Sequence, residues 1–176
     1  MIALNFLALV VLVLANGFFV AAEFSLVSVR RARIEMLVTA GNARARRVLK
    51  LVDNINAYIS ATQLGITLAS LALGAISEPV VARLLAGWLA PLPELWQHII
   101  SFAITIATIT FFHIVFGELV PKRLALERAE AVALAIGWPL DLFYKIFYWP
   151  TRLLFWVGTQ IVRLLGLRGE GRHGAI

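Results

Sequence analysis

The sequence FGELVPKRL at residues 116–124 ends a strongly apolar stretch and combines three residue types with distinct chemistry. Proline has no N–H, and in a helix the N–H of residue 121 would bond to the carbonyl of Gly117, so Pro121 frees that carbonyl. Gly117 has no side chain to shield the oxygen, and Glu118 adds a carboxylate beside it. Irregular backbone is tolerated at membrane depth only within protein or around a cavity, so this stretch is a candidate site.

Two hydroxyl side chains lie toward the end of other apolar stretches, Ser25 after VAAEF and Ser70 after TLA. Together with the Gly117 carbonyl and Glu118 they would form an all-oxygen cluster contributed by three helices. Oxygen ligands suit hard cations such as Mg²⁺ or Ca²⁺, and the same geometry also serves Na⁺. The supporting residues of this candidate site are Pro121, Glu23 and Asn16.

Each of these residues also has an ordinary structural role open to it. A proline followed by Lys-Arg is a common helix stop, and Glu118 can pair with Lys122 four residues on. Glu23 can extend to the membrane interface or pair with Arg30. His113 is a lone histidine on an apolar helix with no second histidine or cysteine nearby, so core packing is favoured over a zinc site.

The composition places these residues in a membrane protein. Hydrophobic residues make up 61% of the 176, charged residues only 15%, and the mean hydropathy is +0.87. A soluble domain is about half apolar and about a quarter charged. The chain has no cysteine, which excludes disulfides, thiolate metal sites and a cysteine nucleophile.

The net charge of +6 is distributed in blocks. Residues 30–50 carry seven basic side chains against one acidic, and residues 122–172 carry eight against four, whereas residues 77–98 carry one basic and two acidic. Basic blocks that alternate with a weakly acidic one follow the positive-inside rule. The pattern predicts that both basic blocks and the C-terminus are cytoplasmic and that the N-terminus is outside, and it argues against nucleic-acid binding.

The segments predict an all-α membrane protein with three transmembrane helices. Residues 2–29, about 57–76 and about 99–120 each reach the roughly 20 residues that a bilayer requires. No basic residue precedes the first run, and it is too long for a signal peptide, so it is predicted to be retained. Residues 30–52 are predicted to form a cytoplasmic helical hairpin around the turn sequence AGN.

Two further segments are apolar but interrupted. Residues 77–98 contain three of the six prolines and two tryptophans, and are predicted to re-enter the membrane or to lie at its outer interface. Residues 131–167 are apolar enough for a fourth span, but prolines and charges interrupt them, and a single crossing would leave their arginines outside. We therefore predict a C-terminal belt helix in the inner interface, with a short fourth helix as the alternative.

Three stretches resemble the transmembrane domain of the CorC and cyclin-M magnesium transporters: ANGFFVAAEFSLVSVRRARIE (15–35), SATQLGITLASLALG (60–74) and FGELVPKRLAL (116–126). The resemblance covers all three predicted spans. It implies a homodimer that exports Mg²⁺, with Na⁺ influx as the candidate coupled flux. It also implies that the ion is held at Ser25, Ser70, the Gly117 backbone and Glu118.

The resemblance also implies an organisation. Residues 1–124 are expected to form the three-span core, including the hairpin, and residues 125–170 the juxtamembrane belt. Family members continue into a cytosolic pair of cystathionine-synthase-type domains that binds ATP. This sequence stops at RGEGRHGAI, so we expect a truncated chain, with ATP acting only through the missing domains.

The predicted function is Mg²⁺ transport by a homodimer in the inner or plasma membrane. The alternative is a membrane-bound Mg²⁺ sensor or regulatory subunit that binds the ion without carrying it. One cation site would serve either function, so the sequence leaves both open. Enzyme activity is not predicted, because the sequence has neither an HExxH nor a GxSxG motif, and no aspartate pair of the kind that intramembrane hydrolases use.

Overall fold

A computed structural model of the chain describes residues 2–164, and every regular element in this part is a helix. The elements are α1 (Ile2–Ser28), α2 (Arg31–Thr39), α3 (Ala43–Asp53), α4 (Ile55–Leu89), α5 (Glu94–Ile114), the π-helix η1 (Val115–Leu119), α6 (Val120–Glu127), α7 (Ala129–Ile146) and α8 (Tyr148–Leu164). The all-α prediction is therefore confirmed for the described residues.

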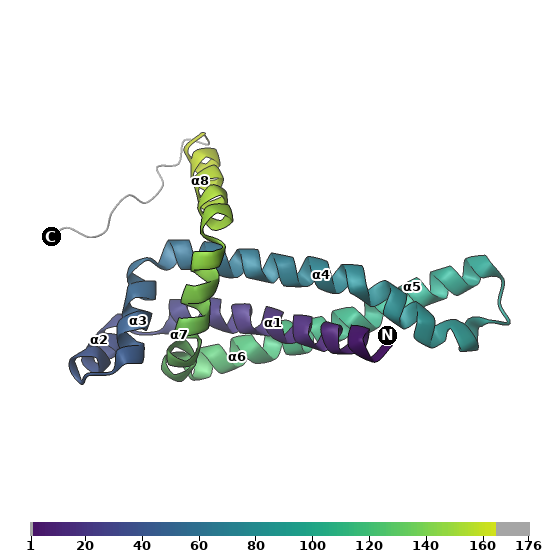
Figure 1. Cartoon of the computed structure of the whole chain (residues 1–176), viewed down its shortest axis with the longest axis horizontal. Coiled ribbons are helices and arrows are strands. Elements are labelled where there is room, and N and C mark those ends of the chain that lie inside the picture. The colour runs from purple at the N-terminus through teal and green to yellow at the C-terminus, as the bar shows by residue number, and fades with distance from the viewer. Residues whose placement is uncertain (1, 165–176) are drawn as a thin grey trace.

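Three helical segments are long and apolar enough to cross a membrane: Leu4–Ser28, Ile55–Leu89 and Glu94–Glu127. They run along the long axis of the molecule (Figure 1), and α1 packs against α4 on one side and against η1 and α6 on the other. A fourth crossing would arise only if α7 and α8 together formed one bent span. The chain is thus an integral membrane protein with three to four candidate spans.

The second span extends further than the sequence predicts. The sequence predicts that residues 77–98 re-enter the membrane or lie at its outer interface, but α4 continues through Pro79 to Leu89, and α5 begins directly after Pro93. Pro79 removes one backbone donor, while the alanines and leucines that follow it favour helix, so the chain turns only at the later prolines. At 1.5 Å per residue α4 is about 50 Å long, which exceeds a hydrocarbon core of about 30 Å. The α4–α5 hairpin accordingly extends beyond the start of α1 (Figure 1).

The helical hairpin predicted at residues 30–52 is present as α2 and α3. Gly41 lies between them with a φ of +86°, a backbone conformation that favours glycine. Asn42 then caps α3, because its side-chain oxygen accepts hydrogen bonds from the backbone N–H groups of Arg44 and Ala45. The AGN turn predicted from sequence is therefore a glycine turn followed by a helix cap.

The largest buried cluster lies at this end of the molecule, where α1, α2, α3, α4 and α7 meet. Its fully buried side chains include Leu26 of α1, Ile34 of α2, Val48 and Leu51 of α3 and Leu140 of α7. The hairpin is thus packed against the first span and the C-terminal helices. We refer to this packed end of the molecule, where α1, α2, α3, α4 and α7 meet, as the base.

Asp141 is a buried carboxylate in this base. Tyr58 Oη donates a hydrogen bond to Asp141 Oδ1 at 2.6 Å, Lys145 Nζ lies 2.8 Å from Oδ2, and Lys50 Nζ lies 3.5 Å from Oδ1. The sequence indicates only that Asp141 interrupts an apolar segment. In the structure it connects α3, α4 and α7, and its charge is compensated by two lysines.

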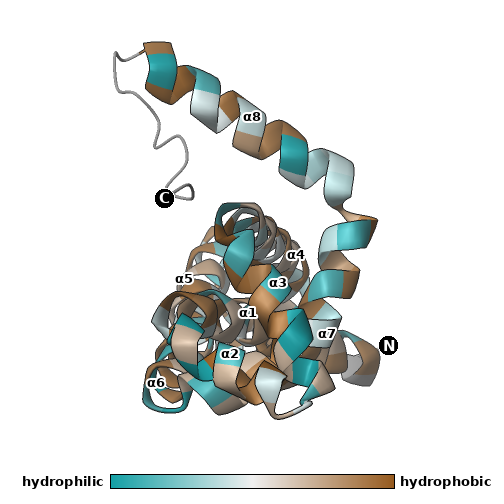
Figure 2. Ribbon diagram, turned by 90° about the vertical axis from the view of Figure 1, so that its left-hand side faces the viewer, coloured by the Kyte–Doolittle hydropathy of each residue, from teal (hydrophilic) through white to brown (hydrophobic). Residues whose placement is uncertain are grey.

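The C-terminal helices α7 and α8 meet at a bend of 82°. Both run across the long axis of the bundle in Figure 1, and Figure 2, which looks along that axis, shows α8 extending away from it with alternating hydrophilic and hydrophobic bands. Together with the end of α6, these helices cover the described part of the predicted belt, residues 125–164. Its last residues, 165–170, lie outside the described range.

Candidate cation site

The third span changes its helical geometry at η1. The Val120 N–H bonds to the Val115 carbonyl five residues back, and Pro121 follows at the start of α6. A π-helix is rare, occurs mostly as a single-turn insertion, and is frequent at functional sites. The sequence predicts a break caused by Pro121, and the structure shows a widened turn before it that contains both Gly117 and Glu118.

The carbonyl of Gly117 faces α1. It accepts a hydrogen bond of 2.9 Å from Asn16 Nδ2, and both residues are buried. The two helices approach closely here, because a Cβ atom on Gly17 would lie 2.9 Å from Pro121 Cγ and 3.0 Å from the carbonyl oxygen of Phe116. Only glycine at residue 17 permits this distance without a shift, so Gly17 allows Asn16 to reach the π-helix.

Two further side chains complete this group. Ser70 Oγ of α4 donates to Asn16 Oδ1 at 3.3 Å and lies 3.4 Å from His113 Nε2 of α5. A Cβ atom on Gly117 would lie 2.9 Å from His113 Cδ2 and 3.1 Å from Asn16 Nδ2. Asn16, Ser70, His113 and the Gly117 carbonyl therefore meet where the three candidate spans converge, and we refer to these four groups as the Asn16 cluster.

Ser25, a predicted ligand, lies away from this cluster. It is fully buried in α1 and donates to the Ala22 carbonyl at 3.1 Å. Nine residues separate it from Asn16 on the same helix, which corresponds to about 13 Å along the axis. In this arrangement Asn16, named from the sequence only in a supporting role, is the residue of α1 that contacts Ser70 and Gly117.

Glu118 is adjacent in sequence to the cluster, and its side chain is exposed. Within residues 2–164 no ion pair joins Glu118 to Lys122, whose Nζ lies 4.5 Å from the centre of the Phe24 ring. Glu23 is half-buried, and the described residues show no ion pair between it and Arg30. The described part of the chain therefore contains neither of the two ion pairs that the sequence allows, Glu118 with Lys122 and Glu23 with Arg30.

His113 has a polar environment that the sequence reasoning missed. Core packing was the favoured role, but the imidazole contacts Ser70 and lies against Gly117. The available signal was its position four residues before Gly117, which places the two residues on the same face of a helix. That spacing indicates a shared location once Gly117 is considered a candidate.

A cation at the Asn16 cluster would meet neutral donors with one carboxylate nearby. In the part of the chain that the structure describes, no group of three or more His, Asp or Glu side chains is close enough to hold a metal ion. The available oxygens belong to Asn16, Ser70 and the Gly117 backbone, with Glu118 one residue on. Asn16 Nδ2 uses one of the two lone pairs of the Gly117 oxygen. A cation that approached along that lone pair could bind only after the amide turned away.

Comparison with known proteins gives consistent matches over nearly the whole chain. The family model described as the cyclin M transmembrane N-terminal domain matches residues 7–176. UPF0053 protein YhdT of Bacillus subtilis (strain 168) is 43% identical over 169 residues, covering 93% of this chain and 36% of the relative. UPF0053 protein YugS of the same organism is 38% identical over 178 residues, covering 100% and 42%. UPF0053 protein sll0260 of Synechocystis sp. is 36% identical over 163 residues, covering 91% and 36%. The chain therefore spans about two fifths of the length of these relatives.

Proposed function

The chain belongs to the family of cyclin-M transmembrane N-terminal domains, as its three motifs predict, and from that premise we propose that it forms the Mg²⁺ pathway of a transporter. The family is linked to Mg²⁺ transport and is transporter-like rather than catalytic. The observation that carries the proposal is the meeting of Asn16, Ser70 and the Gly117 carbonyl at a π-helical turn. Each comes from a different candidate span, so movement of one span against another would alter the site.

The proposed ligands are Ser70, the Gly117 carbonyl, Glu118 and Ser25. Glu118 supplies the negative charge that a divalent ion requires, and it lies on the same turn as Gly117. Asn16 positions the Gly117 oxygen and adds its own amide oxygen once the amide turns. Ser25 lies about 13 Å further along α1, so we assign it to the cytoplasmic side of the pathway.

We further propose the orientation that the charge pattern predicts, with the N-terminus outside and α2, α3 and α8 on the cytoplasmic side. The crosswise direction of α7 and α8 supports an interfacial belt, because the spans run along the other axis (Figure 1). The chain has no native cysteine, so Arg44→Cys, Glu94→Cys and Arg163→Cys each create a single label site. An impermeant maleimide applied to intact cells is expected to label only the Glu94→Cys protein, and labelling of Arg163→Cys would mean that α7 and α8 cross the membrane.

Transport and sensing are separated by reconstitution. In proteoliposomes that contain a Mg²⁺-sensitive dye, the transporter is expected to give a protein-dependent change in dye signal when an outward or inward Mg²⁺ gradient is applied. An imposed Na⁺ gradient tests whether the two fluxes are coupled. Mg²⁺ binding measured by calorimetry without flux would contradict the transporter and favour the sensor.

The resemblance of the three motifs implies a homodimer, which we propose as the transporting unit. Its interface is expected to involve α4 and α5, which carry exposed apolar side chains along much of their length. Native mass spectrometry of the detergent preparation used for reconstitution is expected to detect the dimer. If the protein is monomeric at every concentration in a preparation that transports Mg²⁺ after reconstitution, the dimer is contradicted and the transport function still stands.

A further inference from the structure

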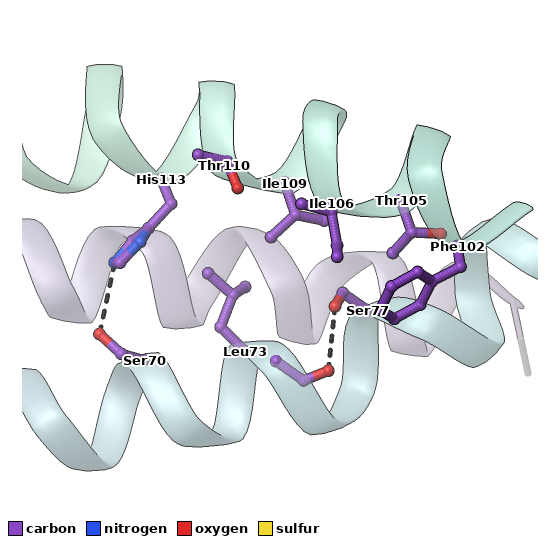
Figure 3. Close-up of a pocket in the computed structure, with 10 residues that line it drawn as sticks. Ser70, Leu73, Ser77, Phe102, Thr105, Ile106, Ile109, Thr110 and His113 are labelled. Atoms are coloured by element: carbon purple, nitrogen blue, oxygen red, sulfur yellow. Dashed lines mark hydrogen bonds between the residues drawn. The ribbon is translucent and has the colours of Figure 1, made fainter. Parts of the chain in front are cut away.

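A cavity of about 280 Å³ lies between α4 and α5, on the side of the Asn16 cluster that faces the α4–α5 turn. Its polar lining consists of Ser70, Ser77, Thr105, Thr110 and His113, and its remaining wall is largely apolar. Figure 3 shows Ser70 and His113 joined across one end of the cavity, with Ser77 and Phe102 at the other. Since Ser70 and His113 also belong to the Asn16 cluster, the cavity and the cluster share a wall.

Two hydroxyls of this cavity, those of Ser77 and Thr105, can accept hydrogen bonds from a ligand. Ser77 Oγ donates to the Gly74 carbonyl at 3.0 Å, and Thr105 Oγ1 donates to the Ser101 carbonyl at 2.7 Å. A hydroxyl has one donor and two acceptor lone pairs, so these bonds use the donor and leave the lone pairs free. Both side chains are buried, with exposed fractions of 4% and 3%. The groups that they offer to a ligand are therefore acceptors.

Water molecules bound to a cation point their hydrogens outward and so present donors. Mg²⁺ in particular gives up its water reluctantly and usually keeps several waters when a protein binds it. Six waters at about 30 Å³ each occupy about 180 Å³, which fits within this cavity. A bare cation would instead find only neutral oxygens here, without a charge to replace its hydration.

A further hydroxyl of α5, outside the residues that line the cavity, is buried without a partner in the described part of the chain. Ser101 lies one turn before Thr105 on α5, is 8% exposed, and has no hydrogen-bond partner for its Oγ among the described residues. An unpaired buried hydroxyl requires an explanation, and a buried water molecule would provide the missing partner.

We propose that this cavity is a vestibule that binds Mg²⁺ with its first hydration shell intact, next to the Asn16 cluster at which protein oxygens replace that shell. The vestibule rests on the proposed Mg²⁺ pathway and adds a second, chemically different binding place to it. The contact between Ser70 and His113 separates the two, so an ion that passes from one to the other must open that contact.

Hexaamminecobalt(III) tests the vestibule, because it carries six ammine ligands that it does not release. Their N–H groups point outward and donate hydrogen bonds, as the O–H groups of a hydrated ion do. Calorimetric titration of the purified protein is expected to show binding. Replacing the two acceptors in the double variant Ser77→Ala/Thr105→Val is expected to weaken that binding at least fivefold. Thr108→Val is the matched control, since it removes a hydroxyl from the same helix without touching the cavity, and it is expected to bind as the wild type does.

The outcomes distinguish the vestibule from the pathway itself. Equal hexaamminecobalt(III) affinity in all three proteins, or no binding to the wild type, would overturn the vestibule. Normal Mg²⁺ flux in Ser77→Ala/Thr105→Val proteoliposomes would also overturn it while leaving the pathway standing. A third outcome combines the two measurements. If hexaamminecobalt(III) binding depends on Ser77 and Thr105 but the wild-type protein shows no Mg²⁺ flux in proteoliposomes, the hydrated-cation site is supported and the transporter is contradicted. Thermal melts of the three proteins check that each variant is folded.

Discussion

Glu118→Gln is expected to lower Mg²⁺ affinity by at least about tenfold, the equivalent of about 1.4 kcal/mol, with little change in thermal stability. The amide keeps the size of the carboxylate but removes the charge that offsets a divalent ion, and Mg²⁺ leaves its water only for a site that replaces it well. The side chain is exposed and has no ion pair within the described residues. Its neutralisation therefore does not deprive any buried charge of its partner, and the folded state is not destabilised. Calorimetric titration with Mg²⁺, accompanied by thermal melts, measures both quantities.

The matched control is Glu127→Gln. Glu127 is also exposed, ends α6 on the same segment, and undergoes the same loss of one negative charge. It is expected to keep wild-type affinity, which separates loss of a ligand from loss of general electrostatic attraction. A Glu118→Gln protein that binds Mg²⁺ as tightly as the wild type would remove Glu118 from the ligand set.

Pro121→Ala is expected to weaken Mg²⁺ binding by about five- to tenfold, because a hydrogen bond of about 1 kcal/mol would then compete for the Gly117 oxygen. Alanine restores the N–H that proline lacks, and in a regular helix this group bonds to the carbonyl four residues back, which belongs to Gly117. Asn16 Nδ2 already bonds to that oxygen, so the new donor adds a second competitor to any cation. The same titration and melts measure the effect.

Pro79→Ala is the matched control for this substitution, since Pro79 also lies inside a candidate span but away from the Asn16 cluster. Alanine at residue 79 restores a backbone N–H that lies far from any proposed Mg²⁺ ligand. This variant is therefore expected to leave Mg²⁺ affinity unchanged. If Pro121 is only a helix stop, the two proline variants should bind Mg²⁺ equally well. Wild-type affinity in both Pro121→Ala and Glu118→Gln would end the cation-site proposal.

The parts of the fold that follow from composition were predictable. Apolar length locates the candidate spans, and turn residues between helix-forming segments locate the helical hairpin, without any knowledge of packing. The continuation of α4 through Pro79 was not, because a single proline weakens a helix without deciding where it ends. The π-helix was equally hidden, since glycine and proline near one another indicate an irregular turn but not its type.

The candidate site was predictable in its residue types more than in its geometry. Gly117 and Ser70 were named from sequence and lie in one cluster. The roles of Asn16 and His113 depend on the rotation of α1 and α5 about their axes, and spacing within one helix does not fix the face that it turns to its neighbours. That Ser25 is a ligand remains a prediction. Because Ser25 lies about 13 Å from Asn16 along α1, it could share an ion with the Asn16 cluster only if α1 moved relative to the other spans.

The hydrogen bond from Asn16 to the Gly117 carbonyl has a thermodynamic consequence for any cation that uses this oxygen. If the cation takes the lone pair that Asn16 Nδ2 uses, only molecules in which the amide has turned away are competent to bind. The observed dissociation constant then equals the intrinsic one divided by the competent fraction. A bond with a net stability of about 0.5–1.5 kcal/mol lowers the apparent affinity by roughly three- to fourteenfold. The same bond reforms when the ion leaves, which favours release. In the proposed site Asn16 would thereby act as a competing ligand for the Gly117 oxygen. The strength of its hydrogen bond would set the balance between tight binding and ready release of the ion.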